Sequence, residues 1–219
     1  MKKEFSVFKK LEKSGVARVM EQAAEFGFEY DDPQWPNLGQ GSAEAGALKG
    51  APARVSTISM NDKQHGYAPI AGLQKLRENV ASAYNNIFRS AKKSGYTYRN
   101  VSVAGGGRTV ISRVVASMRD IKIGYFVPDY SAYEEILNCF KNVEAVPIFL
   151  DPKDKFRCDL KKLKQTIKQE NIKALLLSNP SNPTGNVLKD DNLKELVEMA
   201  KKEKFYLIID EFYFNFIYN

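Results

Sequence analysis

From Val101 onward the sequence alternates short, continuous apolar runs with stretches of helical periodicity. Such runs, bounded by turn residues, are typical of strands buried on both faces, and their alternation with amphipathic helices indicates βαβ units. Strands joined in this way run parallel, so the pattern predicts an α/β fold of three α/β/α layers around a mostly parallel sheet. Asp159 and Asp190 are expected to cap the last two helices. We expect strands at 101–104, 121–127, 143–150, 174–177 and 206–209, and helices at about 107–118, 131–140, 159–169 and 190–203.

The chain before this alternation has a different pattern. Apolar side chains recur at roughly helical spacing in segment 4–28, so we expect an N-terminal helical arm there. Residues 31–56 are rich in Gly, Ala and Pro and lack periodicity, which predicts an irregular connector, and a further helix is expected at about 71–92. The predicted organisation is an arm and connector over 1–56 and a large α/β domain over 57–219.

The composition narrows the class of protein. Hydrophobic residues make up 43% of the 219 residues and charged residues 27%, as in ordinary globular proteins. No apolar run approaches the length that spans a bilayer, and no signal-peptide apolar region follows Met1, so we expect a cytoplasmic protein with no membrane partner. Cys139 and Cys158 are not in a CxxC spacing and His65 is the one histidine, so no metal site is expected.

The formal charge of +7 leaves two interpretations open. Lysines gather at 92–93, 161–168 and 201–204, where they fall at predicted helix ends and on polar helix faces. A solvated surface explains them simply, whereas binding to nucleic acid is the alternative. No aromatic RNA-binding motif or zinc finger supports that alternative, so no nucleic-acid partner is expected.

Ligands of open parallel sheets bind at the carboxyl ends of the strands. This rule selects the residues that directly follow each expected strand, which are 105–109, 128–133, 178–185 and 210–213. They are also the most distinctive residues of the chain. Position and chemistry therefore indicate the same binding site.

The first of these segments has the character of a phosphate cradle. Gly106 and Gly107 let the backbone approach an anion closely, and the following helix offers free N–H groups at its N-terminus. Arg108 or Thr109 can add a further donor. The spacing matches neither the P-loop nor the dinucleotide fingerprint, and a tight turn without a ligand is the alternative.

The other segments carry groups that suit a pyridine ring. Tyr130 can lie flat on an aromatic ring, although a core position is the alternative, and Asn182 lies in a turn between two prolines where its amide can donate to a phenolic oxygen. Asp210 ends a buried run, where a carboxylate needs a cation such as a protonated ring nitrogen; a core arginine is the alternative partner. Tyr213 follows three residues later and can donate to an oxygen of the same ring.

Three motifs carry a family resemblance. Residues 178–185 read Ser-Asn-Pro-Ser-Asn-Pro-Thr-Gly, residues 210–213 read Asp-Glu-Phe-Tyr, and residues 67–77 read Tyr-Ala-Pro-Ile-Ala-Gly-Leu-Gln-Lys-Leu-Arg. From about Trp35 to its end the chain resembles the class I/II aminotransferases, fold-type-I enzymes that use pyridoxal 5′-phosphate. The first motif is the most specific of the three.

The resemblance implies a role for each matching residue. The phosphate of the cofactor would be held by the loop that contains Gly106, Gly107, Arg108 and Thr109. The ring would be held by Tyr130 stacking on its face, by Asn182 and Tyr213 at its 3′-oxygen, and by Asp210 at its nitrogen.

Two further roles follow from the dimeric sites of the family. Tyr67 would reach the phosphate bound by a neighbouring subunit, and Gly39 falls where the family's N-terminal segment passes over the substrate. The implied partners are an amino acid, a 2-oxo acid and a second copy of the chain, or a complementing C-terminal polypeptide.

One expected residue is not in this sequence. The resemblance places the Schiff-base lysine downstream of Tyr213, and the sequence stops at Asn219. We therefore expect the N-terminal portion of an aminotransferase, with an incomplete large domain and no small domain, which is inactive in amino transfer alone. A non-catalytic module that binds the cofactor or a partner is the alternative.

Overall fold

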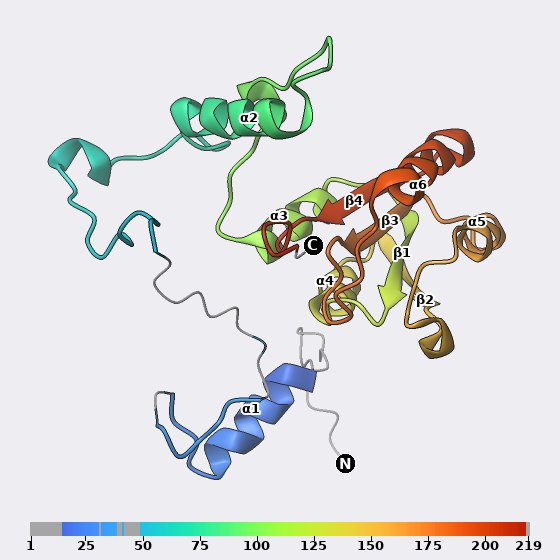
Figure 1. The fold of residues 1–219 in the computed structure, drawn as a ribbon, viewed down its shortest axis with the longest axis horizontal. Helices are drawn as coiled ribbons and strands as arrows, with labels where there is room; N and C mark the ends of the chain where they lie inside the picture. The colour runs from blue at the N-terminus through green and yellow to red at the C-terminus, as the bar shows by residue number, and fades with distance from the viewer. Residues whose placement is uncertain (1–14, 31, 39–40, 42–48, 218–219) are drawn as a thin grey trace, which may run out of the picture. The chain divides into compact units, whose positions relative to one another are not determined.

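The computed structural model describes residues 15–30, 32–38, 41 and 49–217 (Figure 1). Contacts divide the chain into two compact units. One comprises Met1–Pro36 with Gly107–Asn219, and the other is Asn37–Gly106. The domain boundary predicted at residue 57 stays a prediction.

The larger unit is built on a four-stranded parallel sheet, which confirms the predicted fold class (Figure 1). The strand order is β2-β1-β3-β4. β1 pairs with β2 along seven residues, from Ile121 opposite Val143 to Val127 opposite Phe149. The strands are β1 (Ile121–Val127), β2 (Val143–Phe149), β3 (Ala174–Ser178) and β4 (Tyr206–Asp210).

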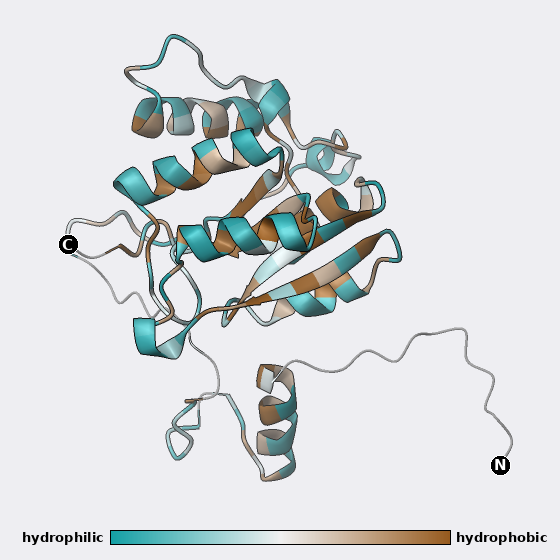
Figure 2. Ribbon diagram, turned by 90° about the vertical axis from the view of Figure 1, so that its right-hand side faces the viewer, coloured by the Kyte–Doolittle hydropathy of each residue, from teal (hydrophilic) through white to brown (hydrophobic). Residues whose placement is uncertain are grey.

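Helices cover both faces of this sheet. Side chains alternate along each strand, so each strand contributes apolar side chains to both faces. In β3, Ala174 and Leu176 join one apolar cluster, and Leu175 and Leu177 join the other. The first cluster packs against α3 (Gly107–Ala116) and α4 (Ala132–Asn138), and the second against α5 (Leu160–Gln169) and α6 (Asp190–Glu203). Figure 2 shows hydrophobic residues concentrated in the strands and on the inner sides of these helices. The result is the expected three-layer arrangement.

Close packing at the centre of the sheet depends on Gly124 in β1. A Cβ atom there would lie 2.9 Å from Cδ1 of Ile148 and 3.0 Å from Cδ1 of Ile172. Both isoleucines are buried in the cluster beneath α5 and α6. The missing side chain of Gly124 therefore lets two larger ones fill the core.

The predicted strand at 101–104 is wrong, since the described residues of that segment form no strand. The backbone groups there are satisfied within the smaller unit: Val103 N donates to Ala71 O at 2.9 Å, and Arg77 Nε donates to Val101 O at 2.7 Å. Gly72 has φ of 95°, and a Cβ on it would lie 2.8 Å from Cβ of Val103. An apolar run without a neighbouring strand here bonds instead to the loop before helix α2 (Gln74–Phe88) and to an arginine of that helix.

Two predicted caps have different outcomes. Asp159 caps α5, where its Oδ1 accepts from the N–H groups of Lys161 and Lys162 at 2.9 and 3.1 Å. Asp190 is not a cap, because Lys189 precedes α6 and no side chain caps it. Asp190 lies inside the first helical turn, where the negative charge of a carboxylate interacts favourably with the helix dipole.

The expected N-terminal helix is present as α1 (Gly15–Glu25), which has no buried residue. Residues 1–14 lie outside the described part of the chain. Besides α2, the smaller unit contains the short 3₁₀ helices η1 (Asp62–His65) and η2 (Tyr98–Asn100). In the larger unit a third one, η3 (Pro152–Asp154), follows β2.

Candidate cofactor site

The candidate site lies at the carboxyl ends of β1 and β3, where the chain turns to opposite faces of the sheet. The chain leaves β1 for α4 on one face and leaves β3 for α6 on the other. The ladder between these neighbouring strands ends at Tyr125 opposite Leu176. Such a switch point opens a crevice at the strand ends, which is where ligands bind in folds of this kind. Two predicted segments, 128–133 and 178–185, border it.

Asp210 is the last residue of β4 and is paired in register with Ser178 of β3. Its partly buried carboxylate accepts two hydrogen bonds, from the Tyr133 hydroxyl to Oδ2 and from Phe212 N to Oδ1, each at 3.0 Å. Within the described residues no arginine pairs with it. The position of Asp210 is therefore fixed by neutral donors.

Tyr133 ends the predicted segment 128–133, although no role was assigned to it. It lies in the first turn of α4 with 0% of its surface exposed. Burial, and then the negative charges of Asp210 and Asp129, raise the pKa of Tyr133 well above its ordinary value. The phenol therefore stays protonated and donates to Asp210.

The turn that carries Asn182 is fixed through Ser178, whose surface is 7% exposed. The Ser178 hydroxyl donates to Oδ1 of Asp129 and accepts from Asn182 N at 2.9 Å. Ser178 N donates to Oδ2 of Asp129 at 3.1 Å. Asn179 N donates to Asp210 O at 2.9 Å, so the turn is also bonded to the end of β4. Together Asp129, Tyr133, Ser178, Asn182 and Asp210 form what we call the ring-side network.

Tyr130 follows Asp129 at the exit of β1. Its backbone N–H donates to Oδ1 of Asp129 at 2.8 Å, and its ring meets Tyr133 edge to face, with centroids 5.5 Å apart. Tyr213 is partly buried and makes edge contacts with Phe212 and Phe216, at 4.9 and 6.0 Å. The structure thus brings Tyr130 directly to the ring-side network, whereas Tyr213 lies among aromatic neighbours just after β4.

The residues predicted to hold a phosphate are exposed. Gly107, Arg108 and Thr109 form the first turn of α3, and Gly106 has φ of 97° with open space where a Cβ would lie. Nη2 of Arg108 lies 2.7 Å from Oε2 of Glu135 in α4, with 57% of the Arg108 side chain exposed. The main-chain N–H groups that begin a helix remain the natural anion donors at this place. We call residues 106–109 the phosphate-side segment.

The other two predicted residues are not placed at the site. Tyr67 belongs to the smaller unit, where its side chain is fully exposed. Gly39 lies outside the described residues.

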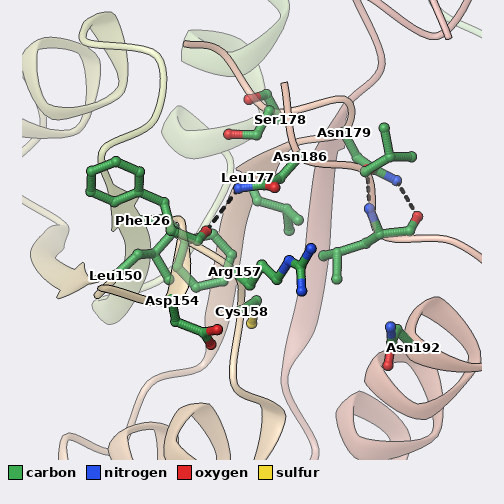
Figure 3. Close-up of a pocket in the computed structure, with 14 residues that line it drawn as sticks. Phe126, Leu150, Asp154, Arg157, Cys158, Leu177, Ser178, Asn179, Asn186 and Asn192 are labelled. Atoms are coloured by element: carbon green, nitrogen blue, oxygen red, sulfur yellow. Dashed lines mark hydrogen bonds between the residues drawn. The ribbon is translucent and has the colours of Figure 1, made fainter. Parts of the chain in front are cut away.

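A cavity of about 400 Å³ lies beneath the loop that follows β3, and Ser178 of the ring-side network lines it (Figure 3). Asn186 Nδ2 donates to the carbonyl oxygens of Lys155 and Phe156, and the Asn179 amide exchanges two hydrogen bonds with the Leu188 backbone, each at 2.9 Å. Apolar lining comes from Phe126 and Leu177, on the face covered by α5 and α6. Ser178, Asn179 and Ser181 of the predicted segment 178–185 line this cavity, whereas the residues to which a cofactor contact is assigned do not.

The one thiol among the residues that line this cavity is not activated. Burial raises the pKa of its Cys158 thiol to about 12, so the thiol stays protonated. Among the residues that the structure describes, no group of His, Cys, Asp or Glu side chains can hold a metal ion, and no helix is long and apolar enough to cross a membrane.

Three members of the ring-side network lie in predicted segments but were assigned no individual role: Asp129, Tyr133 and Ser178. Ser178 stands inside a motif that was recognised, and Asp129 directly precedes Tyr130 after a predicted strand. Tyr133 also falls within the helix predicted at about 131–140. The signal for Asp129 and Ser178 was their shared position at strand ends, which the rule for parallel sheets already selects.

Comparison with known proteins decides the family. The sequence pattern described as "Aminotransferase class I and II" matches residues 33–219. The chain belongs to this family. An uncharacterised aminotransferase of Methanocaldococcus jannaschii is 27% identical over 209 residues, which cover 93% of this chain and 46% of that protein. A probable aspartate/prephenate aminotransferase of Thermus aquaticus is 31% identical over 154 residues, which cover 69% of this chain and 39% of that protein.

A solved structure supports the same assignment. The aspartate aminotransferase of Thermus thermophilus with maleate is similar with a TM-score of 0.61 and 26% identity, covering 70% of this chain and 39% of that one. The chain thus spans less than half the length of the family members that it matches.

Proposed function

We propose that this chain is the ring-holding portion of a pyridoxal phosphate-dependent aminotransferase, which transfers an amino group between an amino acid and a 2-oxo acid. Membership of the family supports the reaction class. The observation that carries the cofactor proposal is the setting of Asp210 at the carboxyl end of β4.

Asp210 fits a protonated ring nitrogen. It is partly buried, its described partners are a phenol and a backbone N–H, and it lies at the carboxyl end of β4 opposite Ser178 of β3. A carboxylate in such a place gains from a cationic hydrogen-bond donor, and the two neutral donors hold it in one orientation for that partner. When bound, the cofactor would supply a ring that withdraws electrons from the substrate's reacting carbon, which a carboxylate at the ring nitrogen strengthens.

The remaining roles follow the family motifs. Tyr130 covers the ring, and the side chains of Asn182 and Tyr213 donate to its 3′-oxygen. The phosphate-side segment binds the phosphate through its main-chain N–H groups, with Arg108 and Thr109 beside them.

The complete site is proposed to involve more than this segment of chain. Tyr67 would serve the site of a second copy in a homodimer, and Gly39 would contact the substrate. The catalytic lysine is proposed to come from the part of the aminotransferase that follows Tyr213. Amino transfer is therefore proposed for the whole protein, and cofactor binding for the chain in hand.

Titration with pyridoxal 5′-phosphate tests this proposal. We expect the chain to bind the cofactor and Asp210→Ala to weaken binding by about 10- to 100-fold, because a charge-assisted hydrogen bond is lost. Asp120→Ala is the matched control, since Asp120 is exposed at the opposite end of the sheet, directly before β1. Equal affinity of the Asp210 variant and the unmodified chain would remove Asp210 from the site.

A further inference from the structure

The sheet opens between β1 and β3 before either strand reaches the site. Their ladder covers only Ile123 to Tyr125 on β1, whereas β3 and β4 remain paired to Ser178 opposite Asp210. Beyond the ladder, the two loops that carry Tyr130 and Asn182 lead to helices on opposite faces. No main-chain ladder bond therefore fixes one loop against the other.

Side-chain hydrogen bonds of Asp129 bridge this opening. Its carboxylate accepts from the backbone N–H of Tyr130 and from both the hydroxyl and the backbone N–H of Ser178. The first bond stays within the β1 loop, and the other two cross to the end of β3. One carboxylate thus binds the two diverging loops together.

The connection continues to Asn182. The Ser178 hydroxyl donates a hydrogen bond to Asp129 and accepts one from Asn182 N at 2.9 Å. Its donor and one acceptor position are then both in use, and Ser178 is buried, so water does not compete freely for either. A continuous path runs from Asp129 through Ser178 to the turn that carries Asn182.

We propose that Asp129 is a positioning residue of the cofactor site, which acts through Ser178 to hold Asn182 at a fixed place relative to Tyr130. The inference rests on the proposed function, in which these two residues contact the same ring. Two contacts on one rigid ring require loops held within a fraction of an ångström, and surface loops do not supply that precision unaided.

The surroundings of Asp129 fit this role. The pKa of Asp129 is raised above its ordinary value, because the effect of burial exceeds the opposing effect of the hydrogen bonds from Ser178 and Tyr130. Asp210 adds a negative charge from β4, and Tyr133 from α4 faces both carboxylates as a neutral phenol. Three hydrogen-bond donors compensate for the burial of the Asp129 carboxylate. The same bonds fix the orientation of the carboxylate, so that it can position the two loops that it joins.

The test uses variants of the chain with two independent measurements. Ser178→Ala removes the hydroxyl, Asp129→Asn keeps the volume with one acceptor oxygen, and Ser178→Thr restores a hydroxyl. Ser131→Ala is the matched control, because Ser131 is exposed in the same β1 loop and its side chain makes no cap hydrogen bond. Amide hydrogen exchange at Asn182 is measured without cofactor, and induced circular dichroism of pyridoxal 5′-phosphate is measured at saturation.

We expect exchange at Asn182 to accelerate by about tenfold in Ser178→Ala, with partial recovery in Ser178→Thr and no change in Ser131→Ala. Cofactor affinity should fall by about 3- to 30-fold in Ser178→Ala and Asp129→Asn. The induced dichroism per bound cofactor should change as well, because it reports how the ring is held. A variant that is merely less stable would keep the signal of each bound cofactor.

The outcomes separate this inference from the proposed function. If the unmodified chain binds the cofactor and both variants bind it with unchanged affinity and dichroism, the positioning role is overturned while the proposed function stands. If the unmodified chain binds no cofactor, both are overturned. If Ser178→Ala does not fold, Asp129→Asn decides between the same results.

Discussion

The ring-side network and the phosphate-side segment are built in different ways. The network joins the ends of β1, β3 and β4 with α4 through hydrogen bonds between buried or partly buried groups. The phosphate-side segment is exposed, and Arg108 there forms an ion pair with Glu135 of α4. In the proposed site, packed side chains would therefore set the orientation of the ring, whereas the phosphate would be bound by backbone N–H groups at the start of a helix.

The strongest test of this comparison is Tyr133→Ala. Removing a fully buried aromatic ring leaves a cavity and an Asp210 carboxylate without its phenol, so we expect the free energy of unfolding to fall by about 3–5 kcal/mol. Urea unfolding measures this loss. Tyr206→Ala is the control, because that side chain is 77% exposed and its truncation should cost less than about 1 kcal/mol. Similar losses in the two variants would contradict a buried network.

The pH dependence of stability tests the network at Asp129. Its pKa is raised in the folded state, so its contribution to stability is fully present below the unfolded pKa and is lost as pH rises through the folded value. Asp129→Asn lacks this titration. Urea unfolding from about pH 3 to pH 7 should therefore show the unmodified chain losing stability relative to the variant as pH rises. A constant difference between the two proteins would mean that the pKa of Asp129 is not raised in the folded state.

The segments of the site were predictable from the sequence, but the links between them were not. Asn182 and Asp210 stand in local motifs at the ends of recognisable strands. Asp129 and Ser178 are 49 residues apart, and their contact requires β1 to lie beside β3 rather than beside β2 alone. Apolar runs indicate where strands are, but their order in the sheet depends on packing that no single run encodes.

The prediction of a strand at 101–104 failed for the same reason, namely that a strand depends on its neighbours in the fold. The run is apolar and short enough for a strand, but a strand exists only where a neighbour completes its hydrogen bonds. Here Ala71 and Arg77 supply partners for Val103 and Val101 instead. The cap predicted at Asp190 failed for a similar reason, since its identity suits a helix start but its position is one residue inside.

On the phosphate side the larger effect is expected at Gly106. Its φ of 97° is strained for any side chain, so Gly106→Ala should lower the free energy of unfolding by about 1–2 kcal/mol although nothing lies where the Cβ would go. Gly105→Ala is the matched control, because Gly105 has open space and no such φ, and it should change stability by less than about 0.5 kcal/mol. Thermal unfolding of the pair measures the difference, and equal stability would argue against the left-handed conformation at Gly106.

The smallest effect on stability is expected at Arg108. Its ion pair with Glu135 is exposed on the arginine side, and such pairs contribute about 0–1 kcal/mol. Arg108→Ala should therefore leave urea unfolding nearly unchanged, and Arg108→Lys should behave in the same way. If Arg108 also stands beside the cofactor phosphate, the alanine variant should weaken pyridoxal 5′-phosphate binding more as salt is lowered, because screening no longer masks the lost charge. A large loss of stability in Arg108→Ala would mean that the phosphate side is held by side chains as firmly as the ring side, and the contrast between the two regions would disappear.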